Sequence, residues 1–186
     1  MGSGKYYPQN LLKEGVHMQQ LVKIYTCFIY YLNKLIGWTV ALLLAIMSLL
    51  IFWQVFSRTL VGTSLTWSEE LSRFIMIWIV LLGSCVALLK NEHIVVNVLA
   101  NYVSEKTKKS IDIFIYLISI VFFIVLVIYG WDLGQASVSQ KAPSTGISMF
   151  WAYLSIPVGA VLLILNSISL ILERLFYIQK SVGEEK

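Results

Sequence analysis

Sixteen consecutive uncharged residues run from Phe74 to Leu89, between the polar segments 66–73 and 90–93. At about 1.5 Å per residue this run alone reaches about 24 Å as a helix, which also fits a buried or re-entrant helix. The helical turns on either side extend it to the thickness of a hydrocarbon core, about 30 Å. We therefore expect a membrane-spanning helix whose first turns carry charges that avoid lipid and meet a partner.

Three more apolar runs of similar length occur in the chain, which is 58% hydrophobic and only 13% charged, with a mean hydropathy of +0.78. This composition lies outside that of soluble globular proteins. It predicts an all-α membrane protein with four transmembrane helices, in a single domain over residues 18–186. The expected spans are about 35–56, 70–90, 111–131 and 149–172.

Lysine and arginine are unevenly distributed between the two sets of connections. One set carries only Arg58, Arg73 and Lys141, and the segments on the other side carry the remaining eleven. Because short loops rich in Lys and Arg stay in the cytoplasm, both termini are expected there. The net charge of +4 then lies beside anionic lipid headgroups, and no nucleic-acid partner is expected.

Two segments outside the spans have amphipathic patterns. The stripe Leu21, Tyr25, Phe28 and Leu32 indicates either a short interfacial helix or an early start of a tilted first span. Residues 92–103 are expected to form a second short interfacial helix. Residues 1–17 are polar, contain no signal-peptide core, and are treated as a leader before Met18, a candidate natural start.

One face of the second span combines charge and small residues. Its charged end has Glu69 and Arg73 at i and i+4, with Glu70 and Arg73 at i and i+3. Gly83 and Ala87 form a small-xxx-small pair that lets another helix approach closely. Packing within the bundle and contact with another subunit both remain open for this face.

A few other polar or helix-breaking residues stand in the spans. Asp112 is expected on the first turn of the third span, paired with Lys108 or Lys109. Gln54 and Asn166 are candidates for hydrogen bonds between helices, and Pro157 predicts a kink.

The sequence contains no motif typical of an enzyme: HExxH, GxSxG, P-loop and glycine-rich nucleotide motifs are all absent. The two histidines lie outside the spans, and the two cysteines are far apart, so no catalytic residue, metal site or cofactor is expected. Every acidic residue lies at a span end or in a loop. That placement argues against an autonomous four-helix homodimeric carrier, the main alternative to an accessory subunit.

The stretch TWSEELSRFIMIWIVLLGSCVALLKNEHIVVNVL resembles the signature region of the small membrane subunit of tripartite ATP-independent periplasmic (TRAP) transporters. The residues that carry the resemblance are Trp67, Glu69, Glu70, Arg73, Trp78, Gly83, His93 and Ile94. Asn97 departs from the family pattern, which often has an acidic residue there.

The resemblance implies a subunit of a sodium-driven importer of organic acids, of the sialic acid or C4-dicarboxylate type, in a bacterial inner membrane. Its expected partners are a large membrane subunit, which it braces, and a periplasmic substrate-binding protein. No substrate-binding residue is expected in such a brace. Candidate partner-interface residues are Trp67, Glu69, Glu70, Arg73, Trp78, Gly83, Ala87 and His93.

Overall fold

A computed structural model describes residues 9–60, 62, 65–90 and 105–184 of the chain. The long helices are α1 (Gln9–Leu60), α2 (Thr66–Lys90), α4 (Glu105–Ala136) and α6 (Ser155–Glu184), with the short α5 (Phe150–Tyr153) directly before α6. Each long helix has a stretch long and apolar enough to cross a membrane. The prediction of four spans in an all-α chain is therefore confirmed.

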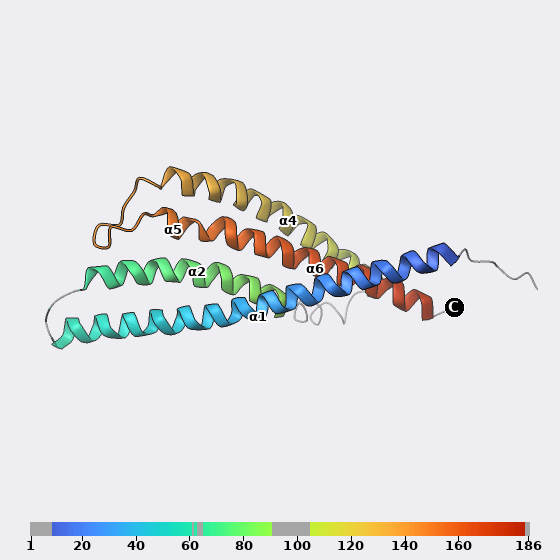
Figure 1. Ribbon diagram of the computed structural model, residues 1–186, viewed down its shortest axis with the longest axis horizontal. Coiled ribbons are helices and arrows are strands. Elements are labelled where there is room, and N and C mark those ends of the chain that lie inside the picture. Colours follow the sequence, from blue (N-terminus) through green and yellow to red (C-terminus); the bar gives the residue numbers. More distant parts are fainter. Residues whose placement is uncertain (1–8, 61, 63–64, 91–104, 185–186) are drawn as a thin grey trace, which may run out of the picture.

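The long helices lie in one row rather than in a closed square. Figure 1 shows α4 beside α6, α6 beside α2 and α2 beside α1, and these neighbours are in contact. α1 begins and α6 ends at the same end of the molecule, as an even number of spans requires. Near that end α1 also reaches α6, where the Tyr25 hydroxyl donates a hydrogen bond to the Leu165 carbonyl at 3.0 Å.

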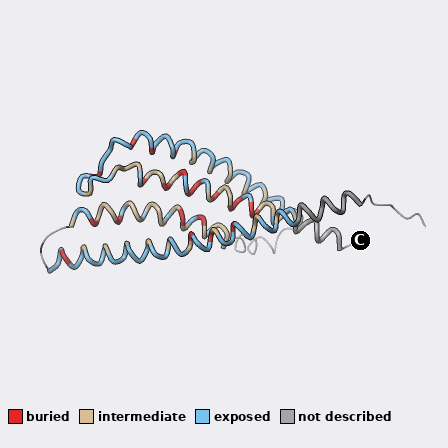
Figure 2. The backbone as a smooth tube through the Cα atoms, in the orientation of Figure 1, coloured by how far each residue is buried: buried red, intermediate tan, exposed pale blue. Residues whose placement is uncertain are grey.

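α6 is the most buried helix of the row, with α4 on one side and α2 on the other. Half of its most apolar stretch is buried, against 6% in α1 and in α4 (Figure 2). Its buried residues are mostly small, which allows α2 and α4 to approach from two sides. The small buried residues are Ser155, Gly159, Ala160, Ser167 and Ser169. The outer helices instead expose apolar side chains, as expected of surfaces in contact with lipid or with other membrane subunits.

α1 is longer than the predicted first span. Its 52 residues extend about 78 Å, far beyond a core of about 30 Å. The stripe from Leu21 to Leu32 belongs to this continuous helix and does not form a separate short helix. The helix also includes residues 9–17 of the expected leader; residues 1–8 and the second expected interfacial helix at 92–103 lie outside the described residues.

The helix break before α6 agrees with the kink predicted from Pro157. Proline has no N–H to donate to the carbonyl of Tyr153, four residues earlier, and its ring crowds that carbonyl. α5 ends at Tyr153 and α6 begins at Ser155, so Leu154 separates the two helices. The Ser155 hydroxyl donates to the Ala152 carbonyl at 2.6 Å across this break.

Two glycines allow close helix contacts. A Cβ at Gly130 of α4 would lie 2.6 Å from Ile156 Cγ2 and 3.1 Å from Pro157 Cδ. A Cβ at Gly159 of α6 would lie 2.9 Å from Leu81 Cβ. Gly130 and Gly134 form the Gly-x-x-x-Gly spacing typical of such contacts, a signal that the sequence analysis missed.

We expect Gly130→Ala to lower the stability of the chain by about 1–3 kcal/mol, because the added methyl group overpacks the contact between α4 and α6. Gly83→Ala is the matched control, since nothing lies within 4 Å of a Cβ at Gly83. Thermal unfolding in one detergent measures both variants. Equal melting temperatures would show that α4 and α6 do not pack this closely.

Candidate subunit interface

Glu69 and Arg73 form the ion pair predicted from their spacing at the start of α2. The Arg73 side chain is 70% exposed and that of Glu69 is 46% exposed. An exposed pair of this kind contributes little to the stability of its own chain. Its charges remain accessible to another protein.

Glu70 does not join this pair. Its carboxylate accepts hydrogen bonds from the backbone N–H of Ser144 at 2.9 Å and from the backbone N–H and hydroxyl of Thr145 at 2.9 and 3.0 Å. The Glu70–Arg73 contact considered at i and i+3 is therefore not formed. Glu70 instead holds the 137–149 loop against the start of α2.

This loop has a defined local structure. Ser148 pairs with Lys141 across it, and Gly146 adopts a positive φ of 68°, which glycine tolerates without strain. The Gly146 N–H donates to the Ala142 carbonyl at 2.9 Å. The loop is thus held both by its own turn and by Glu70.

We expect Glu70→Ala to release the loop, because the Ser144 and Thr145 N–H groups lose their acceptor. Hydrogen exchange at these two amides should become about tenfold faster or more. Glu69→Ala on the same helical turn is the control, since Glu69 pairs with Arg73 rather than with the loop. Unchanged exchange in the Glu70 variant would contradict this role.

The two tryptophans proposed for the interface differ in their surroundings. The Trp78 indole N–H donates to the Trp151 carbonyl at 3.1 Å, so this residue links α2 to α5 within the chain. Trp67 is exposed at the start of α2. Trp67, which is 43% exposed, is therefore the more accessible of the two to a partner.

The rest of the predicted α2 face is open. Met76 and Val80 are exposed, the latter by 59%, and Ala87 is exposed as well. Nothing lies within 4 Å of a Cβ placed on Gly83. The sequence left two alternatives for this face, packing within the bundle and contact with another subunit. In the structure the face does not pack within the bundle. We call Arg73, Met76, Val80, Gly83 and Ala87 the open face of α2.

The buried side of α2 belongs to a polar cluster that connects three helices. The amides of Asn33 in α1 and Asn166 in α6 exchange hydrogen bonds of 2.7 and 3.0 Å. Asn166 Nδ2 also donates to the Cys85 carbonyl of α2 at 2.8 Å. The expected helix-bridging role of Asn166 is confirmed, and its partner is Asn33 of α1. Within the described residues, Gln54 makes no hydrogen bond to another helix.

Asp112 has a different environment from the one expected. α4 begins at Glu105, so Asp112 lies two turns inside the helix, where its side chain is only 8% exposed. Its carboxylate lies 3.5 Å from the Arg174 guanidinium of α6 rather than at the helix start. Asp112 does lie on the first turn of the apolar span, which begins at Ser110, but the helix starts earlier than this span, so Asp112 is not at the helix N-terminus.

No group of three or more His, Cys, Asp or Glu side chains that could hold a metal ion occurs within the described part of the chain. His93, the remaining interface candidate, lies outside the described residues.

A row of four membrane helices with one open, small-residue face is typical of a subunit of a larger membrane assembly. Comparison with known proteins identifies the family. Residues 47–176 match the family model of the DctQ component of tripartite ATP-independent periplasmic transporters, so the chain belongs to this family. Its members are components of transporters rather than enzymes.

Curated relatives include small and large proteins. The chain is 27% identical to the sialic acid TRAP transporter small permease protein SiaQ of Vibrio cholerae over 142 residues. This similar region covers 76% of the chain and 79% of SiaQ. It is 34% identical over 140 residues to the sialic acid TRAP transporter permease protein SiaT of Haemophilus influenzae, covering 74% of this chain but only 22% of the relative. It is 27% identical over 103 residues to the C4-dicarboxylate TRAP transporter small permease protein DctQ of Vibrio cholerae, which covers 55% of this chain and 44% of that protein.

Proposed function

We propose that this small TRAP permease subunit is a fixed scaffold that anchors a larger transport subunit in a bacterial inner membrane. The open face of α2 is the observation that carries the proposal, since it exposes Arg73 of the charged pair and leaves the small residues Gly83 and Ala87 uncovered along one side of a membrane helix. A transport domain that moves through the membrane needs an immobile element to move against. Additional helices in the lipid enlarge that element.

The size of one relative supports the large partner. The part of SiaT similar to this chain is about a fifth of that protein, so there the corresponding region is joined to a much longer permease. A separate small chain of this family is expected to meet its large partner by non-covalent contact. Asp112 and Arg174 are not candidates for this contact, because they pair with each other between α4 and α6 inside the chain.

The names of the relatives support a proposal for the cargo. Two of the relatives carry sialic acid in their names and one carries C4-dicarboxylate, so we propose uptake of an organic acid, with sialic acid preferred. Coupling to sodium and a periplasmic binding protein are proposed from the family resemblance. Both termini are proposed to be cytoplasmic from the distribution of Lys and Arg.

Co-expression of the tagged chain with its genomic neighbours, followed by purification in mild detergent and mass measurement, tests this assignment. We expect a stoichiometric complex with a large membrane protein. A homo-oligomer of this chain alone would favour the autonomous carrier, and an unrelated partner would favour a general membrane adaptor.

Arg73→Ala is expected to lower recovery of that complex several-fold, because it leaves Glu69 without its cation at the contact. Lys141→Ala is the matched control, since it removes an exposed positive charge from the 137–149 loop. Equal recovery of complex from the two variants would show that the Glu69–Arg73 pair does not lie at the interface.

A further inference from the structure

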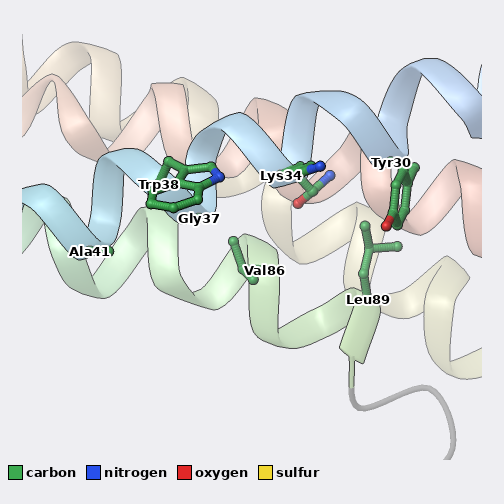
Figure 3. Close-up of a pocket in the computed structure, with 8 residues that line it drawn as sticks. Tyr30, Lys34, Gly37, Trp38, Ala41, Val86 and Leu89 are labelled. Carbon is green, nitrogen blue, oxygen red and sulfur yellow. The ribbon is translucent and has the colours of Figure 1, made fainter.

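A cavity of about 380 Å³ lies between α1 and α2, and none of its lining residues belongs to the open face of α2 or to the 137–149 loop. Figure 3 shows it between the α1 residues Tyr30 to Ala41 and the α2 residues Val86 and Leu89. Gly37 and Ala41 leave space on the α1 side, and nothing lies within 4 Å of a Cβ at Gly37. Missing side-chain volume therefore creates this cavity.

The polarity of the cavity changes along α1. Tyr30 and Lys34 supply a hydroxyl and an ammonium group at one end, and Trp38 adds an indole N–H. Gly37, Ala41 and Val86 make the other part apolar. The amide of Asn33, which also lines the cavity, is already hydrogen-bonded to Asn166. The groups left to receive a ligand are thus one cation and two neutral donors above an apolar slot.

The charge pattern of α1 predicts that Lys34 lies at the depth of lipid headgroups. It is the last charged residue of α1 before Arg58, 24 residues later, which corresponds to about 36 Å of helix and to about 30 Å of hydrocarbon crossed at a tilt. The apolar part of the cavity lies on the Arg58 side of Lys34, which is toward the middle of the bilayer. The order of polar and apolar groups therefore matches the order of headgroup and acyl chain.

We propose that this cavity is a binding site for an anionic phospholipid, with the phosphate beside Lys34 and Tyr30 and one acyl chain over Gly37 and Ala41. The apolar slot over Gly37 and Ala41 suits an acyl chain, and a cavity of about 380 Å³ has room for part of one. Lys34 supplies the charge complementary to the phosphate, on the side where Lys and Arg are concentrated and anionic lipids are expected.

Native mass spectrometry of the purified chain with added phosphatidylglycerol tests this site. Lys34→Gln and Gly37→Leu are each expected to weaken binding about tenfold, the first by removing the cation and the second by filling the slot. Lys23→Gln and Thr39→Leu are the matched controls on the same helix, outside this cavity, and are expected to bind as the unmodified chain does. Phosphatidylcholine is expected to bind more weakly than phosphatidylglycerol.

Equal lipid retention in all four variants, or equal retention of the two lipids, would overturn the proposal and indicate only non-specific lipid around the helices. A cysteine placed at Gly37, in a chain with Cys27 and Cys85 replaced, gives a second test. If it cross-links to a large membrane subunit, a partner helix fills the cavity and the lipid assignment is wrong. The site does not depend on the scaffold function, because lipid binding is measured on this chain alone.

Discussion

Replacing Gly83 with leucine is expected to reduce recovery of the complex with a large membrane subunit by tenfold or more, with little change in the stability of the chain itself. Within this chain the position is open, so the new side chain meets no neighbour. At a contact between helices the same side chain separates the two backbones that the small residue brings together. Co-purification measures assembly, and thermal unfolding of the isolated chain measures stability.

Gly83→Ala is the graded control, since one methyl group keeps the small-residue character of the pair with Ala87. It is expected to retain most of the complex. If Gly83→Leu assembles as well as the unmodified chain, the open face of α2 contacts lipid and another surface anchors the partner.

Replacing Asn166 with leucine is expected to destabilise the chain by about 2–3 kcal/mol. The substitution removes the amide that bonds to Asn33 and to the Cys85 carbonyl, and it leaves a nearly fully buried Asn33 without its α6 partner. In membranes a single hydrogen bond between helices contributes about 0.6–1.7 kcal/mol, and three are lost here. Chemical or thermal unfolding in detergent measures the change.

The double variant Asn33→Leu/Asn166→Leu is expected to be less destabilised than the sum of the two single variants, since no amide then stays buried without a partner. Thr39→Val, at an exposed position of α1, controls for a polar-to-apolar change. Additive single and double variants would show that the two amides do not act as a pair.

The spans and the ion pair were predictable because they depend on local properties. A run of apolar residues predicts a membrane helix wherever it packs, and the spacing of Glu69 and Arg73 brings them together on any helix. The partners of Glu70 and Asn33 are 74 and 133 positions away in the sequence. Periodicity places each residue on a face of its own helix but does not indicate which helix that face meets.

The open face of α2 shows the same limit. Its four-and-three spacing identified the residues on one side of the helix, but burial inside the chain and exposure to a partner have the same pattern. The structure separates them, because α6 approaches α2 at Leu81 and Cys85 instead. The start of α4 was misplaced because the polar residues 105–110 continue the helix beyond the apolar run.

Sodium-dependent uptake by proteoliposomes tests the scaffold function most directly. We expect no uptake with this chain alone, and full uptake only when it is combined with the large membrane subunit and the binding protein. The large subunit and binding protein without this chain should transport poorly. Uptake by this chain alone, or full uptake in its absence, would contradict the proposed role.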